Sequence, residues 1–324
     1  MKILFAFAFV AILAGIGGAL AQTYPARPIA MIVPFPPGGA VDPVARIIAE
    51  RMKAPLGQSI VIENVASGGN GVVGVGRVAR AAADGYTIGF GNWSTYVING
   101  AIYDLPYDVL NDFAPIALVA TTPQVIVGSN TVPAKDLHEL VAWLKANPGK
   151  ASLGTVGVGS ATHIAGLFFQ KQTDTRLLIV PYRGAAQAMQ DMLGGQLDLF
   201  MPQATLALPQ ARAGTVRAYA VMADRRIDSG PDIPTVDEAG TQGLYLSTWS
   251  GLWAPKGTPQ PIIRMLNAAT REALADASVR ARLAELGQVV PPVDQQTPEA
   301  LGAYQRAEAT KWWPIIKAAG IKGE

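Results

Sequence analysis

Two glycine-rich loops contain the residues best suited to hold an anion. The first, residues 34–42, reads Pro-Phe-Pro-Pro-Gly-Gly-Ala-Val-Asp, and the second, residues 157–163, reads Gly-Val-Gly-Ser-Ala-Thr-His. Each loop connects a predicted strand to a predicted helix, whose first N–H groups have no partner within the helix. These groups lie at the positive end of the helix dipole, and glycine lets the backbone approach a ligand closely. We therefore predict an anion-binding site at these loops, to which Ser160 and Thr162 add hydroxyl donors.

The same residues do not form a catalytic set. His163 could act as a base toward Ser160, but no acidic partner is visible, and we interpret it as a helix-start residue that borders a pocket. His138 is expected on the solvated face of a helix, and two separated histidines do not make a metal site. The sequence has neither a Gly-x-Ser-x-Gly elbow nor a Gly-x-x-x-x-Gly-Lys loop. We therefore predict neither an enzyme nor a cofactor.

Trp93 allows two interpretations that the sequence does not separate. It lies in a predicted loop with Asn92, Ser94 and Thr95, where polar and aromatic groups could meet a ligand. The alternative is a buried ring that anchors the loop. The pair Trp312-Trp313 is expected to pack a terminal helix onto the core.

The elements that must position these loops alternate between strands and helices. Strands are predicted over residues 29–33, 59–63, 86–90, 152–156, 177–180, 197–201 and 216–222. One helix is predicted to start near Asp42, which would be its N-cap. Further helices are predicted over residues 72–82, 137–145, 161–170, 185–193, 206–213, 261–275, 279–286 and 298–318. Strands separated by helices of this length indicate parallel, doubly wound sheets. The fold class is therefore α/β, in two such units.

Composition excludes several classes of protein. The 324 residues are 50% hydrophobic and only 15% charged, which excludes a disordered or coiled-coil chain and suggests about two domains. A net charge of +2 does not supply the basic face that nucleic-acid binding requires. The absence of cysteine excludes disulfides, iron–sulfur clusters and a thiol nucleophile.

The N-terminus has the pattern of a secretory signal peptide. Lys2 precedes an apolar run over residues 3–16, and small residues follow up to Ala21. The run is shorter than the ~20 residues that span a bilayer, and no cysteine follows for a lipid anchor. We therefore predict cleavage after Ala21 and export of a soluble mature chain.

Several motifs spread along the mature chain identify a family. They include Pro-Phe-Pro-Pro-Gly-Gly, Ala-Asp-Gly-Tyr-Thr, Gly-x-Gly-Ser-x-Thr-His and Val-Pro-Tyr-Arg-Gly, and they lie at residues 24–29, 33–42, 68–71, 83–87, 105–107, 112–115, 157–163, 180–184, 232–240 and 254–259. Together they make the chain resemble the Bug-type receptors, which are the extracytoplasmic solute-binding components of tripartite tricarboxylate transporters.

This resemblance implies a type II periplasmic-binding-protein fold, with two doubly wound α/β lobes and a cleft between them. After a signal peptide over residues 1–21, one lobe would combine residues 22–122 with 224–324. The other lobe would comprise residues 123–223. The hinge crossings would lie near residues 121–124 and 222–225.

The resemblance also implies a set of ligand-binding residues. Backbone amides of the two glycine loops would grip a ligand carboxylate, partly through water, and Asp42 would hold the first loop. The residues implied are Phe35, Gly38, Gly39, Ala40, Asp42, Trp93, Ser94, Gly159, Ser160, Ala161, Thr162, His163 and Gln203.

Two departures from the family pattern bear on the ligand. Ala40 stands where Ser or Thr is usual, which removes a hydroxyl. Met201-Pro202-Gln203 stands where Phe-Asp-Asn is frequent, which removes a carboxylate that could pair with a ligand amine. The second change argues against amino acids and favours dicarboxylates or aromatic carboxylates.

The expected function is a periplasmic receptor, acting as a monomer, that delivers a small carboxylate to the membrane permease subunits of a tripartite transporter. One alternative is an accessory that presents the ligand to a membrane sensor kinase, which the sequence does not distinguish from transport. A more distant alternative is an exported enzyme that uses Ser160 and His163.

Overall fold

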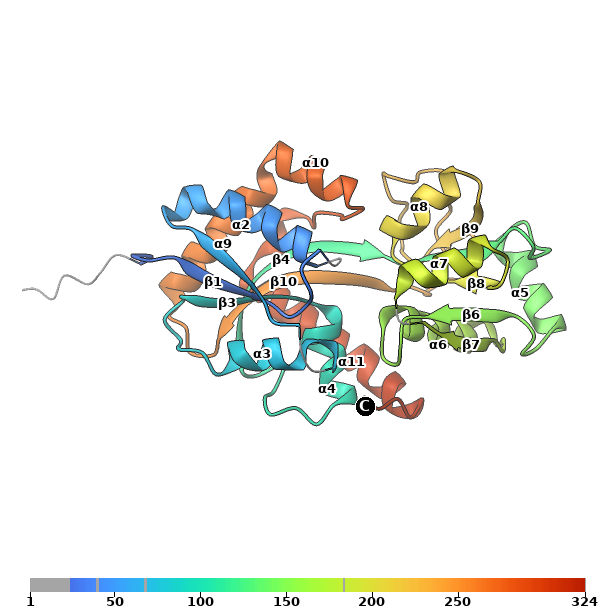
Figure 1. Cartoon of the computed structure of the whole chain (residues 1–324), viewed down its shortest axis with the longest axis horizontal. Helices are drawn as coiled ribbons and strands as arrows, with labels where there is room; N and C mark the ends of the chain where they lie inside the picture. Colours follow the sequence, from blue (N-terminus) through green and yellow to red (C-terminus); the bar gives the residue numbers. More distant parts are fainter. Residues whose placement is uncertain (1–23, 39–40, 67–68, 183, 324) are drawn as a thin grey trace, which may run out of the picture.

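The computed structural model describes residues 24–38, 41–66, 69–182 and 184–323. The predicted signal peptide lies outside these residues. The described chain forms two five-stranded sheets, each covered by helices on both faces, and they lie side by side in Figure 1. We call each sheet with its helices a lobe. Within the described residues, no helix combines the length and apolar character that a membrane crossing requires.

Lobe 1 is built on a sheet with the strand order β2-β1-β3-β10-β4. Its strands are β1 (Ile29–Val33), β2 (Ile60–Asn64), β3 (Thr87–Asn92), β4 (Phe113–Pro123) and β10 (Ser247–Pro255). One face is covered by α2 (Asp42–Leu56), α9 (Gln260–Ala275) and α10 (Ala277–Glu285). The other face is covered by α3 (Val72–Ala79), the π-helical turn η2 (Ser94–Ile98), α4 (Asn99–Ile102) and α11 (Pro298–Ala318).

Lobe 2 is built on a sheet with the strand order β7-β6-β8-β5-β9. Its strands are β5 (Val125–Ser129), β6 (Ser152–Thr155), β7 (Leu178–Pro181), β8 (Leu199–Phe200) and β9 (Val216–Val221). Helices α5 (Leu137–Ala146) and α6 (Ala161–Thr173) pack on one face, and α7 (Ala185–Leu193) and α8 (Ala204–Arg212) pack on the other. Two short 3-10 turns, η1 (Gly69–Gly71) and η3 (Val293–Gln296), belong to lobe 1.

The two α/β lobes are as predicted, and the βαβ strands pair in parallel, but each sheet also contains one strand of opposite direction. In lobe 1, β10 is antiparallel to both β3 and β4. In lobe 2, β5 is antiparallel to both β8 and β9. The reason is the path of the chain. It leaves lobe 1 through β4 and enters lobe 2 through β5, then leaves lobe 2 through β9 and re-enters lobe 1 through β10. The two entering strands, β5 and β10, run against the other strands of their sheets.

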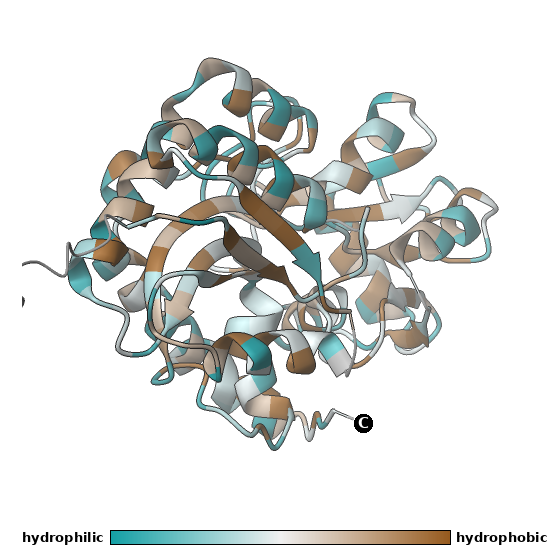
Figure 2. Ribbon diagram, turned by 60° about the vertical axis from the view of Figure 1, so that its left-hand side comes forward, coloured by the Kyte–Doolittle hydropathy of each residue, from teal (hydrophilic) through white to brown (hydrophobic). Residues whose placement is uncertain are grey.

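The two crossings are held together by backbone hydrogen bonds. Gln124, the residue between β4 and β5, accepts a bond of 2.9 Å from the Met222 N–H and donates one of 3.0 Å to the Leu246 carbonyl. Hydrophobic residues concentrate on the inner strands and on the helix faces turned toward them (Figure 2). One cluster of buried side chains includes Trp93 and Trp312 of lobe 1 together with Ile164 of lobe 2. The lobes therefore share part of their core.

Candidate functional site

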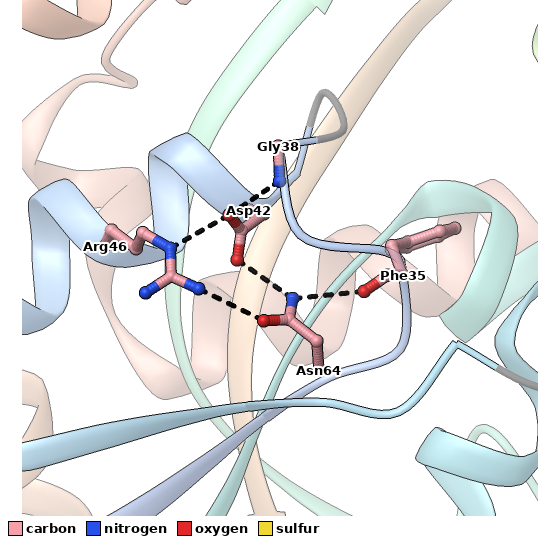
Figure 3. A network of polar contacts seen from close by, with 5 residues as sticks. All are labelled: Phe35, Gly38, Asp42, Arg46 and Asn64. Carbon is pink, nitrogen blue, oxygen red and sulfur yellow. Dashed lines mark hydrogen bonds and ion pairs between the residues drawn. The ribbon is translucent and has the colours of Figure 1, made fainter.

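The first glycine loop is fastened to the sheet by the Asp42 carboxylate. The Gly38 N–H donates to Asp42 Oδ2 at 2.9 Å, and Arg46 Nε donates to the same oxygen at 2.9 Å. Asn64, the last residue of β2, donates from Nδ2 to Asp42 Oδ1 at 2.9 Å and to the Phe35 carbonyl at 3.0 Å (Figure 3). Both ends of the loop segment from Phe35 to Gly38 are therefore tied to one buried network.

Asp42 is not the N-cap that we predicted. Helix α2 begins at Asp42 itself, the N-cap position is Val41, and no side chain caps it. The carboxylate turns back to Gly38, Asn64 and Arg46 instead. Burial alone would raise the pKa of Asp42, but these hydrogen bonds outweigh burial and hold the pKa below its ordinary value. The group is therefore ionised at neutral pH, close to the positive end of α2.

The hydroxyl groups of the second loop are used within the loop. Ser160 is the N-cap of α6: its Oγ accepts from the His163 N–H at 3.2 Å and donates to the Gly157 carbonyl at 2.8 Å. Thr162 Oγ1 accepts from the Val156 N–H at 2.8 Å. In the part of the chain that the structure describes, the N–H groups of Ala161 and Thr162 have no acceptor. The amides of the first turn, and not the hydroxyls, are thus the open donors here.

His163 supports the same loop through its side chain. The Gly159 N–H donates to His163 Nδ1 at 3.2 Å, so Nδ1 carries no proton and the ring is neutral. Burial lowers the pKa of His163, which also favours the neutral ring. This geometry supports the interpretation of His163 as a structural residue, and it occupies the Gly159 amide that we had assigned to the ligand.

We expect the burial of the neutral His163 ring to make the thermal midpoint sensitive to mild acid. The folded-state pKa lies below the ordinary 6.5, so the unfolded chain binds a proton more readily, and stability falls as pH decreases below about 6.5. The loss is at most ~1.4 kcal/mol per pH unit for one group. Scanning calorimetry at pH 7.5 and 5.5 measures it. His163→Gln should reduce the loss of stability between pH 7.5 and 5.5, and the exposed control His138→Gln should leave this loss unchanged. A wild-type profile in His163→Gln would contradict the assignment.

The second loop packs directly against lobe 1. A Cβ placed on Gly159 would lie 2.7 Å from Ile102 Cδ1 and 4.0 Å from Ile98 Cγ2, both on lobe 1. The lobes also touch where α10 ends, because a Cβ on Gly287 would lie 2.7 Å from Thr205 Cγ2 at the start of α8. We call this state, with the lobes in contact at both places, the closed arrangement.

The remaining predicted residues differ in their surroundings. Trp93 is fully buried and packs edge-on against Trp312, which favours the buried-anchor interpretation. Ser94 is buried at the start of η2. Gln203 lies at the N-cap of α8 and its Nε2 donates to Thr248 Oγ1 at 2.8 Å, which joins the two lobes. Gly39 and Ala40 lie outside the described residues.

Sequence reasoning missed the neutral polar residues on the crossing strands. Thr248 on β10 meets Gln203, and Thr122 on β4 donates to Gln288 Oε1 at 2.7 Å. Ser250 Oγ and both amide atoms of Gln124 are buried without a partner among the described residues. The available signal was that Thr248 and Ser250 stand on either side of Trp249, because this alternation is typical of a strand with one polar face.

A groove of about 920 Å³ also lies between the lobes, beside the crossing strands. Its walls include Thr121, Arg225, Arg280 and Val289. None of the predicted ligand-binding residues lines it. The groove and the glycine loops are therefore separate places, which substitutions in the loops can distinguish.

Two lobes, two strand crossings and helix-start loops at the ends of the strands define a type II periplasmic-binding-protein fold. The family model described as "Tripartite tricarboxylate transporter family receptor" matches residues 44–321. The chain belongs to this family of receptors, as its motifs predicted.

Solved structures place the chain among periplasmic binding proteins. The periplasmic binding protein BugD is 38% identical, with a TM-score of 0.77 over 93% of this chain and 100% of BugD. MatC from Rhodopseudomonas palustris, with bound malate, is 36% identical, with a TM-score of 0.77 over 90% of this chain and 100% of MatC. Rpa4515 from R. palustris, with adipate, is 30% identical, with a TM-score of 0.79 over 92% of this chain and 99% of that protein. BugD is described as a periplasmic binding protein, and MatC and Rpa4515 each carry a carboxylate.

Proposed function

We propose that this protein is a periplasmic receptor that captures a small carboxylate between its lobes and delivers it to the permease of a tripartite tricarboxylate-type transporter. Family membership supports the transport role, and the malate and adipate bound to MatC and Rpa4515 support the ligand class. Export after cleavage at Ala21 and action as a monomer remain our predictions, as do lobe boundaries at residues 22–122 with 224–324 and at 123–223.

The observation that carries the proposal is the start of α6. The N–H groups of Ala161 and Thr162 are open donors at a helix N-terminus, and the loop before them is held by Ser160, Thr162 and His163. A carboxylate bound there meets donors already in place, which reduces the entropy lost on binding. Hydrogen bonds to a charged group contribute roughly 1.5–3 kcal/mol each, so a few support a micromolar affinity near −8.2 kcal/mol.

The first glycine loop would supply the opposing donors in this proposal. Asp42 already accepts from the Gly38 N–H and would hold the loop through this bond, so Gly39 and Ala40 would supply the donors to the ligand. Phe35 and Ser94 would border the ligand from lobe 1, with Trp93 as the buried ring beside Ser94, and Gln203 would border it from lobe 2. Gln203 and Thr248 are uncharged, and a neutral contact of this kind suits a hydroxyl or carboxyl group better than an ammonium group.

A thermal-shift screen tests the proposal. Malate, adipate, citrate and benzoate represent hydroxy-, di-, tri- and aromatic carboxylates, and aspartate tests the exclusion of amino acids. A ligand at a hundredfold excess over Kd stabilises the folded chain by about 2.7 kcal/mol. Stabilisation by aspartate alone would overturn the ligand class. Chemical turnover of a bound carboxylate, followed by chromatography, would overturn the receptor role.

We expect Ser160→Ala to weaken carboxylate binding about tenfold, or ~1.4 kcal/mol. The substitution removes the N-cap of α6 and the bond to Gly157, so the first-turn amides lose part of their support. Calorimetric titration measures the change. Asp136→Ala is the matched control, because Asp136 caps α5 in the same lobe. An equal loss of affinity in both variants would show that the effect is general destabilisation.

A further inference from the structure

Helix α11 belongs to lobe 1, but its last turns reach lobe 2. In Figure 1 the helix passes beneath the crossing strands toward α6. Trp312, in these last turns, is 1% exposed, and Phe168 of α6 is 8% exposed. Both large rings lie where the two lobes meet. Separation of α6 from α11 would expose them to water, which is unfavourable.

The Trp312 ring contacts one aromatic side chain from each lobe. Its centroid lies 5.3 Å from that of Phe168 with an interplanar angle of 83°. On the other side it lies 5.6 Å from Trp93 with an angle of 84°. Both are edge-to-face contacts, which stabilise aromatic pairs in addition to the burial of their apolar surface. Trp312 therefore links lobe 2 to the loop at the end of β3, directly before Ser94.

A partly buried carboxylate fixes the orientation of the Trp312 ring. Trp312 Nε1 donates to Glu308 Oε2 at 3.1 Å, and Trp249 Nε1 of the crossing strand β10 donates to the same oxygen at 3.4 Å. Trp93 Nε1 also faces this carboxylate, although it reaches no hydrogen-bond partner among the described residues. Burial raises the pKa of Glu308, against the opposing effect of Lys311 and the indole groups. The ring is thus held by its nitrogen as well as by its faces.

Lys311 adds a second connection at the same place. Its Nζ donates to the Tyr245 carbonyl at 3.0 Å, in the segment that returns from β9 to β10. The same nitrogen lies 5.5 Å from the Phe168 ring centroid and 4.6 Å from that of Trp312, within the range of cation–π attraction. Burial lowers the pKa of Lys311. Phe168 is therefore held between an aromatic edge and a cation, both of them on α11.

We propose that Trp312 is a positioning residue for the ligand site: by packing against Phe168 and Trp93, it stabilises the closed arrangement of the lobes. The inference rests on the proposed function for its effect on ligand affinity, but not for its effect on the lobes. A ligand that binds the closed arrangement gains apparent affinity in proportion to the fraction of molecules already closed. Loss of the Phe168 contact lowers that fraction and hence the affinity.

The test uses the distance between the lobes. The chain has no cysteine, so Lys53→Cys on α2 and Lys150→Cys in lobe 2 provide two unique, exposed sites for spin labels. In the absence of ligand, Phe168→Ala and Trp312→Ala should shift the distance distribution from closed toward longer values. Trp312→Phe, which retains an aromatic edge, should preserve it. Trp313→Ala is the matched control, because Trp313 Nε1 bonds to the Val97 carbonyl within lobe 1.

The second arm measures affinity for malate and adipate by calorimetry. Phe168→Ala should weaken binding about tenfold, or 1.4 kcal/mol, whereas Trp312→Phe and Trp313→Ala should stay within threefold of the wild type. An unchanged distance distribution in Phe168→Ala would overturn the proposal. If the wild type binds neither probe, the distance arm alone decides the role of Trp312, and the failure belongs to the proposed ligand class. Phe168→Ala also covers the case in which Trp312→Ala does not fold.

Discussion

Gly159→Val is expected to abolish carboxylate binding in a chain that still folds. Gly159 has φ = +73°, where a β-branched residue is strained, and a new Cβ would meet Ile102 at 2.7 Å. The strain displaces the Gly159 N–H from His163, and the valine side chain displaces the Ile102 side chain that packs on this loop. Both changes move the open amides of Ala161 and Thr162. We expect at least a hundredfold loss of affinity by calorimetric titration with whichever carboxylate stabilises the wild type.

Gly149→Val separates this effect from backbone strain. Gly149 also has φ = +73°, and a Cβ there would meet no atom within 4 Å. The control therefore carries the same conformational strain, at a distance from the glycine loops. It should lower the thermal midpoint to a similar degree while ligand affinity stays at the wild-type value. Undiminished affinity in Gly159→Val would show that the ligand lies elsewhere, and the groove beside the crossing strands would then be the next place to examine.

Asp42→Ala is expected to have the largest effect on stability among substitutions near the site. It leaves the Gly38 N–H and the Asn64 amide without their buried acceptor and removes a negative charge from the start of α2. We expect a loss of about 2–3 kcal/mol, which lowers the thermal midpoint by ~3–5 °C in a chain of this length. Ligand affinity should fall as well, because the loop from Phe35 to Gly38 loses its attachment to β2.

Arg46→Ala is the control for Asp42→Ala. Arg46 is half exposed, with 51% of its side chain accessible, so solvent screens its ion pair with Asp42 and the pair stabilises the fold less than the buried hydrogen bonds do. The contribution of the Asp42 carboxylate to the free energy of unfolding also depends on pH. Since the folded-state pKa lies below 3.8, the contribution is complete above that value and is lost as pH falls below it. Equal destabilisation by the two substitutions would show that the ion pair, and not the buried network, holds the loop.

Local sequence patterns were sufficient to predict the elements that carry a helical period or a run of β-branched residues. The predicted bounds of β1, α7 and α11 match the structure. Each of these segments carries its own signal, a run of apolar β-branched residues in β1 and helical spacing in α11. The Trp312-Trp313 pair was correctly expected to pack the terminal helix, as its burial and the bond from Trp313 to Val97 confirm.

Strands β4, β5 and β10 were missing from the prediction, and only β10 lacks a local strand signal. β10 reads Ser-Thr-Trp-Ser-Gly-Leu-Trp-Ala-Pro, and its register with β4 is interrupted by bulges. Its strand character depends on partners that are distant in the chain, so local propensity alone did not identify it. The same holds within the site. Glycine located both loops, but only geometry shows that Asp42 ties back to Gly38 and that His163 accepts from Gly159.

The position of β10 has a consequence for the order in which the molecule can assemble. All five strands of lobe 2 lie in one continuous stretch of chain, so its sheet can be completed from local contacts. In lobe 1, β3 and β4 do not pair with each other, because β10 lies between them and is synthesised after the whole of lobe 2. Until Ser247–Pro255 are present, both strands keep an unpaired edge, which is a template for association with other chains. A chain truncated before β10 would therefore combine one complete lobe with an open, aggregation-prone sheet.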